Sequence, residues 1–498
     1  MATTRQSLDE FLSPLAVDIS KVHSLATSLC YTFTQLARES QNQFLSTPIS
    51  DTVLRPENDG QGRGGTNLRV GFIELLGSHN EAQAELNGDL VGHGDSQHRS
   101  RAKRYLEKAW PIGEQLKNNK AQDLFQWIEA TLMSMGKGFA ITSNLDLGKL
   151  LLEGYESARD PSLPPIKITA IVNDSVATLV SFAYQLRSDP KRKAAMGLIV
   201  GTGCNATIPL AISKLHPSKR PAQVKVLDDS EDSPDLKITV NTEWTINGAA
   251  PPLHELKFIT RWDTILDAQG EAPGFQPFEY MTSGRYLGEL GRLIVLDYFV
   301  NELQIPATSL PTKLLQRHGL TTTFFGNLGP HLSSSEPSIL KQIETELPPA
   351  NGPNAWHWTY ETADIVFKIS KAIQRRAAGM TAAAVIALLG CADEIQLSAL
   401  PSPSPIANGQ SFHALIEKPA IEELMVGYTG GCIMHFQDYL QDCQQFLDDI
   451  MNTEFGPSKT KVPRVLLTPC HDGGIIGAGI LAGTVMTIDA TRDDGYTK

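Results

Sequence analysis

The chain has 498 residues, and its 43 Lys and Arg against 55 Asp and Glu give a formal net charge of −12 at pH 7. This acidic balance argues against a nucleic acid partner, and 41% apolar residues without an apolar run of membrane-spanning length predict a globular protein with no membrane span. The N-terminus lacks the apolar core of a signal peptide, and the six cysteines have no metal-type spacing, so we expect a cytoplasmic location, free thiols and no metal ligands.

The first part of the chain predicts helices followed by a strand. Apolar residues recur at helical spacing from Leu8 to Leu15, and again from Val22 to Leu36 after the break expected at Pro14. The patterns that follow predict a strand at 68–76, a polar loop at 78–101 and a helix at 121–135.

A carboxylate lies at the end of the next apolar run. Residues 168–172 predict a strand that ends at Asn173 and Asp174, and residues 179–184 predict a helix after it. A carboxylate fixed at a strand end can take a hydroxyl proton while that oxygen attacks a phosphoryl group. Asp174 is therefore the catalytic candidate, although its residue type taken alone favours a helix cap.

A glycine-rich turn follows shortly afterwards. The apolar run at 197–200 stops at Gly201-Thr202-Gly203-Cys204-Asn205. Small residues let backbone N–H groups approach an anion closely, so we interpret this turn as a phosphate cradle. Gly64-Gly65-Thr66-Asn67 is a weaker signal of the same kind.

Strands and helices alternate in the remainder of the chain. The patterns predict strands at 223–227, 236–240, 423–426 and 464–467, helices at 284–303 and 363–389, and a loop at 401–405. The last two strands lead to Thr429-Gly430-Gly431-Cys432 and to Asp472-Gly473-Gly474. Such strand-to-glycine junctions recur at the ligand crevice of α/β folds.

Three further polar residues are candidates for a site. Asn241 closes a predicted strand and offers an amide, whereas Glu289 lies near a helix start as a cap or a hydroxyl acceptor. Lys137 lies between two glycines, where its charge could offset negative charge on a phosphoryl group. Taken alone, Asn241 is as consistent with an ordinary strand-end turn, Glu289 favours a structural helix cap, and Lys137 favours a solvated surface lysine.

Seven segments in order resemble the eukaryotic hexokinase family, from about Gly64 to Gly483. They are Gly-Gly-Thr-Asn-Leu-Arg-Val (64–70), Lys-Gly-Phe (137–139), Val-Asn-Asp-Ser-Val-Ala-Thr (172–178), Gly-Thr-Gly-Cys-Asn (201–205), Asn-Thr-Glu-Trp (241–244), Ser-Gly-Arg-Tyr-Leu-Gly-Glu-Leu (283–290) and Asp-Gly-Gly-Ile-Ile-Gly-Ala-Gly (472–479). Any one of these matches is weak, but seven in family order are specific.

The resemblance implies an α/β chain with an actin-like ATPase (ribonuclease H-like) fold. Two domains, the small one at 18–192 and the large one at 195–485, would surround a cleft. The implied reaction transfers a phosphoryl group from ATP with Mg²⁺ to the 6-hydroxyl of a sugar, and domain closure would keep water from competing.

The resemblance also assigns roles by position. Asp174 would be the base, assisted by Lys137. The sugar would be held by Asn173, Asn241, Glu289 and Lys137. The nucleotide would be held by Gly64, Gly65, Thr66, Asn67, Arg69, Gly201, Thr202, Gly203, Asn205, Thr429, Gly430, Gly431 and Cys432.

Some phrases look more like the fungal N-acetylglucosamine kinases of this family than its glucose enzymes. Residues 70–77 and 135–142 carry this likeness. Gly136 replaces the usual Thr before the Lys, and Trp244-Thr245-Ile246-Asn247 replaces the usual Trp-Gly-Ala-Phe. We therefore expect N-acetylglucosamine as the substrate, followed by glucose or fructose.

Two abrupt departures interrupt the family pattern. Gly62 occupies the position of an Asp that organises the Mg-nucleotide, and residues 55–63 show no strand periodicity. A Thr-Phe-Ser-Phe-Pro sugar-binding segment and the strand before it are missing at 128–129. The chain as written therefore predicts severely reduced activity. Three interpretations stay open: a sugar kinase, a catalytically impaired sugar-sensing relative, and a shortened copy of an active enzyme.

Overall fold

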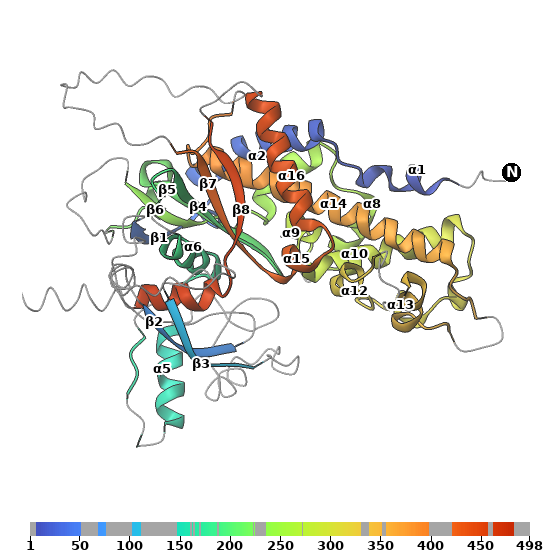
Figure 1. Ribbon diagram of the computed structural model, residues 1–498, viewed down its shortest axis with the longest axis horizontal. Coiled ribbons are helices and arrows are strands. Elements are labelled where there is room, and N and C mark those ends of the chain that lie inside the picture. Colours follow the sequence, from blue (N-terminus) through green and yellow to red (C-terminus); the bar gives the residue numbers. More distant parts are fainter. Residues whose placement is uncertain are drawn as a thin grey trace, which may run out of the picture. The chain divides into compact units, whose positions relative to one another are not determined.

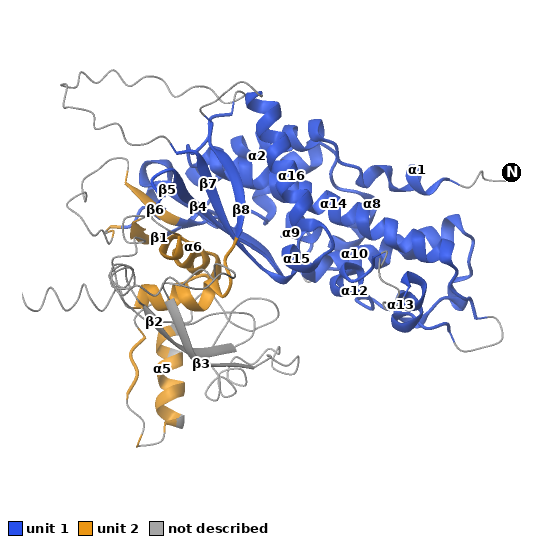
Figure 2. Ribbon diagram, viewed as in Figure 1, with its two compact units in different colours: residues 1–46, 189–221, 240–468 blue, residues 47–188, 222–239, 469–498 orange. Residues whose placement is uncertain are grey.

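The computed structural model divides the chain into two interleaved compact units (Figures 1 and 2). Unit 1 comprises residues 1–46, 189–221 and 240–468, and unit 2 comprises residues 47–188, 222–239 and 469–498. The structure describes residues 6–50, 68–75, 102–110, 147–159, 162, 165–168, 171–186, 189–222, 224, 236–270, 272–329, 338–350, 355–397, 421–456 and 462–482. At 68–75 and 102–110 it describes the backbone alone.

Unit 1 is rich in helices. Its α-helices are α1 (Leu8–Leu12), α2 (Ile19–Glu39), α7 (Ala250–Glu255), α8 (Arg261–Ala268), α9 (Pro277–Thr282), α10 (Gly284–Asp297), α11 (Thr312–Leu315), α12 (Thr322–Gly326), α13 (Ile339–Glu346), α14 (Tyr360–Cys391), α15 (Gly431–His435) and α16 (Tyr439–Phe455). The short 3-10 turns are Ser13–Leu15, Ile212–Lys214, Pro217–Lys219, Asn247–Ala249 and Ala307–Ser309, and a π-helical turn, Tyr298–Glu302, continues α10.

The core of unit 1 forms around α14, which packs against α2 and α16 (Figure 1). Helix α2 begins after Asp18, whose side chain accepts a hydrogen bond from the Lys21 backbone N–H. Its apolar stripe, including Leu25 and Phe33, is fully buried. Among the described residues, α14 is the helix long and apolar enough to cross a membrane, but 89% of its apolar window is buried inside the protein.

A six-stranded sheet brings two glycine turns to the same edge. Its strands are β1 (Leu45–Ser50), β4 (Arg192–Val200), β5 (Cys204–Ala211), β6 (Lys237–Asn241), β7 (Glu423–Thr429) and β8 (Arg464–Pro469), in the order β1-β6-β5-β4-β7-β8. Strand β4 pairs antiparallel with β5, with Val200 opposite Cys204, and parallel with β7, with Ile199 opposite Thr429. Residues 201–203 therefore form a hairpin turn, which lies beside the turn that follows β7.

Unit 2 contains a two-stranded ribbon and three described helices. The strands β2 (Leu68–Leu75) and β3 (Ala102–Trp110) are antiparallel, and the helices are α5 (Leu147–Ala158), α6 (Asp174–Gln185) and Gly473–Ala482. Buried apolar residues of α6 and of Gly473–Ala482 form one cluster. A Cβ on Gly477 would lie 1.8 Å from the Ala177 carbonyl oxygen, so glycine lets these two helices approach closely.

Most predicted elements are confirmed, and one is wrong. The strands at 68–76, 236–240, 423–426 and 464–467 and the helices at 8–15, 22–36, 284–303 and 363–389 match observed elements. The strand expected at 168–172 is absent at its described residues 168, 171 and 172. Asn173 instead caps α6, so the helix begins at Asp174 rather than near residue 179. The expectations at 78–101, 121–135 and 401–405, and at 223–227 apart from Val224, lie outside the described residues.

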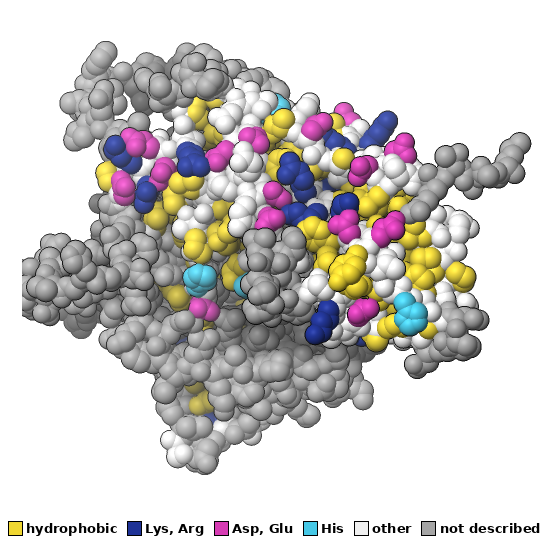
Figure 3. All heavy atoms as spheres, turned by 45° about the vertical axis from the view of Figure 1, so that its right-hand side comes forward, with side chains coloured by type: hydrophobic (Ala, Val, Ile, Leu, Met, Phe, Trp, Pro, Cys, Tyr) yellow, Lys and Arg dark blue, Asp and Glu magenta, His cyan; other side chains and the backbone are white. Residues whose placement is uncertain are grey.

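Basic and acidic side chains are interspersed on the described surface shown in Figure 3. Many of them form exposed pairs, such as Lys368 with Asp364 and Arg464 with Asp448. The surface in this view shows no extended basic stripe on its described residues, in keeping with the acidic net charge.

Candidate functional site

Two amides and a carboxylate meet where β5 begins and β6 ends, on adjacent strands of the sheet. Asn205 Nδ2 donates to Asn241 Oδ1 at 2.9 Å and to Glu243 Oε1 at 3.0 Å. Asn241 Nδ2 also donates to Glu243 Oε1, at 2.9 Å. We call these three residues the polar triad. Amides that donate and accept, beside a carboxylate that accepts, have the chemistry needed to bind neighbouring hydroxyl groups.

Glu243 holds its place in the triad with an unusual backbone conformation. Its φ is +45°, in the left-handed region that costs a non-glycine residue roughly 1 kcal/mol or more. The preceding residue is fixed because the Thr242 N–H and hydroxyl both donate to the Ala206 carbonyl, at 3.0 and 2.8 Å. Glu243 was not among the residues predicted from the sequence. The sequence feature that could have identified it is a carboxylate two residues after Asn241, at the end of a predicted strand.

A second carboxylate lies beside the same strand. Glu279, on α9, is half-buried, and its Oε2 accepts a hydrogen bond from the Cys204 N–H at 3.3 Å. The Thr245 hydroxyl lies 3.5 Å from this oxygen and donates to the Cys204 carbonyl at 3.1 Å. The sequence analysis also missed Glu279, which lies five residues before Gly284 and just outside the matched segment.

The structure gives Glu289 a different role from the predicted one. It is 1% exposed inside α10, and Arg292 pairs with both of its oxygens, at 2.6 and 2.8 Å. The His318 backbone N–H donates to Oε2 as well, at 2.6 Å. Both oxygens of Glu289 are therefore bonded within the protein, by a side chain one helical turn away and by a backbone N–H. This geometry does not support the expectation that Glu289 accepts a sugar hydroxyl, because Arg292 and the His318 backbone already engage both of its oxygens.

The hairpin turn (residues 201–203) is bound tightly to the start of α10. The Gly284 N–H donates to the Gly201 carbonyl at 2.7 Å, and the Arg285 N–H donates to the Thr202 carbonyl at 3.1 Å. Within the turn, the Gly201 N–H donates to the Gly203 carbonyl at 2.8 Å. Thr202 itself is exposed, so the tip of the turn faces solvent.

The turn after β7 (residues 429–432, the β7 turn) contains two glycines with opposite surroundings. Gly430 has φ +121°, and a Cβ there would lie 2.3 Å from the Val200 carbonyl oxygen. A Cβ on Gly431 would meet nothing within 4 Å. Backbone therefore fills one side of the β7 turn, while the exposed other side leaves room for an anion.

The side chains of Asn205 and Cys432, two residues predicted to bind the nucleotide, make other contacts within the protein. The Asn205 amide belongs to the polar triad. The Cys432 thiol is buried, and burial raises its pKa to about 12, so this side chain is a neutral core group. Cys432 can therefore face a ligand only through its backbone.

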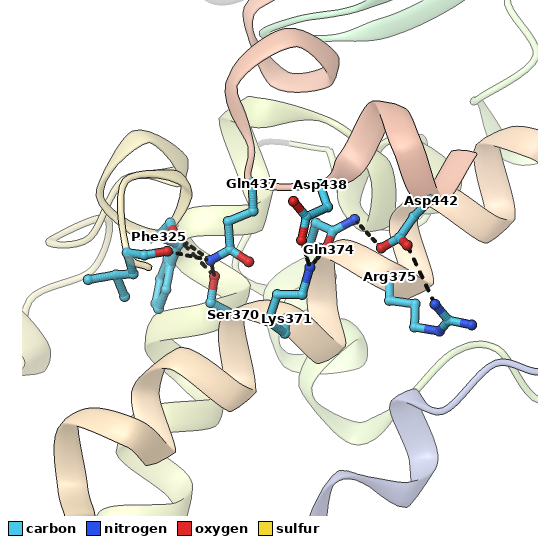
Figure 4. Close-up of polar contacts among 9 residues, drawn as sticks. Phe325, Ser370, Lys371, Gln374, Arg375, Gln437, Asp438 and Asp442 are labelled. Atoms are coloured by element: carbon cyan, nitrogen blue, oxygen red, sulfur yellow. Dashed lines mark hydrogen bonds and ion pairs between the residues drawn. The ribbon is translucent and has the colours of Figure 1, made fainter. Parts of the chain in front are cut away.

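The chain leaving α15 is held by a polar network (Figure 4). Gln437 has φ +45°, and its Nε2 lies 2.9 Å from the Phe325 carbonyl, 3.2 Å from the Leu328 carbonyl and 2.8 Å from Ser370 Oγ. Phe325 and Leu328 belong to α12 and the chain after it, and Ser370 belongs to α14. Gln437 therefore fixes the far end of the segment that begins at the β7 turn.

In unit 2, Asn173 and Asp174 share the beginning of α6. Asn173 Oδ1 accepts hydrogen bonds from the Ser175 N–H at 2.9 Å and the Ser175 hydroxyl at 2.6 Å, so Asn173 is the helix cap. Asp174 is the first helical residue, and its side chain is exposed. The capping alternative therefore applies to Asn173, and the Asp174 carboxylate lies at the helix start without serving as the cap.

The remaining predicted residues lie outside what the structure describes. Gly64, Gly65, Thr66, Asn67 and Lys137 are not among the described residues, and Arg69 is described only as backbone in β2. In the described part of the chain, no group of three or more His, Cys, Asp or Glu residues could hold a metal ion.

Comparison with known proteins gives one consistent family. The hexokinase family models match residues 195–484 and 129–184, and the second match begins directly after the interruption at 128–129. Hexokinase of Kluyveromyces lactis is 24% identical over 441 residues, covering 84% of this chain and 78% of the relative. Glucokinase-1 of the same yeast is 25% identical over 479 residues, covering 89% of each, and hexokinase-1 of Saccharomyces cerevisiae is 30% identical over 287 residues, covering 52% and 53%.

Solved structures give the same fold. The hexokinase of Schistosoma mansoni complexed with glucose matches with a TM-score of 0.66 at 21% identity, covering 96% of this chain and 98% of that one. A second hexokinase crystal structure matches with a TM-score of 0.62 at 18% identity. The fold is therefore the α/β actin-like ATPase fold that the resemblance implied. Because a family model alone matches more than half of the sequence, this chain belongs to the hexokinase family, the ATP-dependent sugar kinases.

Proposed function

We propose that this protein phosphorylates the 6-hydroxyl of a hexose or N-acetylhexosamine with ATP, with N-acetylglucosamine first and glucose or fructose next. The polar triad carries the proposal, because Asn205 and Asn241 present amides to the Glu243 carboxylate at the sheet edge that also carries the glycine turns. Glu279 adds a second carboxylate there. We assign hydroxyl recognition to these four residues and to Asn173.

Asp174 is the proposed base. It would accept the proton of the sugar hydroxyl while that oxygen forms a bond to the γ-phosphorus and the bond from the γ-phosphorus to the leaving oxygen of ADP breaks. Asp174 is exposed on the first turn of a helix whose other face is buried, so its carboxylate is accessible. Lys137 would offset charge on the transferred group. We retain the small domain at 18–192 and the large domain at 195–485 as the proposed functional division.

The glycine turns fit a nucleotide. Gly431 is exposed with open space where a Cβ would be, so phosphate oxygens could approach its backbone. Residues 64–67 and Arg69 would complete the nucleotide site. Mg²⁺ would neutralise phosphate charge. With Gly62 in place of the family's Asp, we propose that phosphates and water supply most of its ligands. The six buried free cysteines accord with a reducing compartment such as the cytoplasm.

A second candidate function is a sugar-binding relative with little turnover. It is favoured by Gly62 and by the N-terminal family match, which begins only at residue 129. If two segments have been lost from the sequence as given, the transcript across codons 63–64 and 128–129 will contain them, and the complete enzyme is then the protein to assay.

Coupled ATP turnover with glucose and with N-acetylglucosamine tests the proposal, alongside calorimetric binding of each sugar and of ADP. Turnover that is abolished by Asp174→Asn supports the kinase. Sugar binding without turnover supports the second candidate. A chain that binds neither sugar would refute both.

A further inference from the structure

A buried glutamine in the turn that follows α2 contacts the backbone of the polar triad. Gln43 is 2% exposed, and its Nε2 donates to the Glu243 carbonyl oxygen at 2.9 Å. The next residue, Phe44, donates its N–H to the Thr242 carbonyl at 3.0 Å. The turn at residues 40–44, which we call the N-terminal turn, therefore binds two successive carbonyls of the segment that carries Glu243.

Glu243 depends on such support because its own backbone is strained. At φ +45° a non-glycine residue relaxes to an extended or helical conformation unless its surroundings prevent it. Rotation about the N–Cα bond of Glu243 would break the bond from Gln43. It would also turn the carboxylate, whose Oε1 accepts from both Asn205 and Asn241, away from the amides.

Gln43 is itself held in a single orientation. Its backbone N–H donates to Ser40 Oγ at 3.2 Å, and Lys219 Nζ donates to its carbonyl at 2.9 Å. Its Oε1 lies against Gly248, where a Cβ would be only 1.9 Å from that oxygen. Since a carbonyl only accepts, the atom facing Glu243 O must be the Nε2 donor, which settles the direction of the amide.

We propose that Gln43 is a positioning residue for the Glu243 carboxylate and so sets the affinity for the sugar. The proposal rests on the function proposed above, because it takes Glu243 as a sugar ligand. Gln43 lies 200 residues from Glu243 in the sequence, on an element to which the sequence analysis assigned no role in the site.

The test compares three variants of the full chain by calorimetry with glucose, N-acetylglucosamine and ADP. Gln43→Met keeps the length of the side chain but removes the donor, and we expect about tenfold weaker sugar binding with ADP affinity unchanged within about twofold. Lys219→Met removes the donor to the Gln43 carbonyl and should weaken sugar binding about threefold; it carries the test if Gln43→Met does not fold. Gln374→Met is the matched control. Gln374 is buried like Gln43, and its Nε2 donates a hydrogen bond from α14 to Asp442 on α16.

The controls separate positioning from stability. Gln374→Met should lower the melting temperature as Gln43→Met does but leave sugar affinity unchanged. The inference is overturned if Gln43→Met binds sugar like the wild type, or if Gln374→Met loses as much sugar affinity at an equal loss of melting temperature. A wild-type chain that binds no sugar would overturn the proposed function and this inference with it, whereas normal binding by both wild type and Gln43→Met overturns this inference alone.

Discussion

Replacing Gly430 with Ala should destabilise the protein strongly, because two separate costs add. At φ +121° an alanine pays roughly 1–2 kcal/mol of backbone strain. Its Cβ would also lie 2.3 Å from the Val200 carbonyl oxygen, at the end of β4, and 2.6 Å from the Gly201 nitrogen, at the start of the hairpin turn. Overpacking against groups that cannot rotate away costs about 1–3 kcal/mol more. We expect a total loss of about 2–5 kcal/mol.

The neighbouring glycine provides the control. Gly431→Ala places its Cβ in open space at the first residue of α15, so stability should stay the same or rise by up to about 1 kcal/mol. If phosphates approach this backbone, the same methyl group should still weaken ADP binding. Urea unfolding followed by circular dichroism measures the first effect and calorimetry the second. A Gly430→Ala variant that unfolds at the wild-type midpoint would refute the reasoning.

Four further substitutions test the two carboxylates, the end of α15 and the buried Lys219. Glu279→Gln should weaken sugar binding more than about tenfold with little loss of stability. Glu289→Gln should lower the free energy of unfolding in urea by about 3–5 kcal/mol, because it leaves the buried Arg292 charge unpaired, and the folded fraction should keep its sugar affinity. The opposite pattern would return Glu289 to the sugar site. Gln437→Ala should weaken ADP binding several-fold by releasing the end of α15, with sugar affinity unchanged, and equal losses for both ligands would contradict that role. Burial lowers the pKa of Lys219 from 10.5 to about 8. Between these pH values the unfolded chain binds more protons than the folded chain, so the stability of the wild type should rise with pH. The rise should be smaller in Lys219→Met, and identical slopes of the urea midpoints of the two proteins from pH 8 to 10.5 would contradict this contribution of Lys219.

Local patterns predicted the parts of the site that depend on neighbouring residues. The apolar run at 197–200 and the glycines after it correctly placed a strand and a tight turn, because both features are set within a few residues. The apolar segment at 179–184 indicated the next helix but not where it begins, because the Ser175 N–H and hydroxyl donate to Asn173 and start α6 at Asp174. A local side-chain to backbone bond set that boundary, which the periodicity does not show.

The choice between Glu279 and Glu289 depended on contacts that the sequence does not contain. Both carboxylates lie close to the same glycine-rich segment, and either could have faced a ligand. The interior position of Glu289 follows from its pairing with Arg292 and with the backbone of His318, which lies 29 residues further on. The contact of Gln43 could be predicted even less from the sequence, because its partner Glu243 lies 200 residues away.

The hairpin of β4 and β5 has a consequence for how sugar preference could diverge in this protein. Its five residues from Gly201 to Asn205 join the proposed phosphate turn to the first amide of the polar triad, and Val200 pairs directly with Cys204. In the proposed site, this short connection sets the distance between the nucleotide phosphates and the sugar. An insertion or deletion in it would change that distance. We therefore expect adaptation to a bulkier sugar at residues outside the connection, such as Thr245, whose hydroxyl lies beside the Glu279 carboxylate.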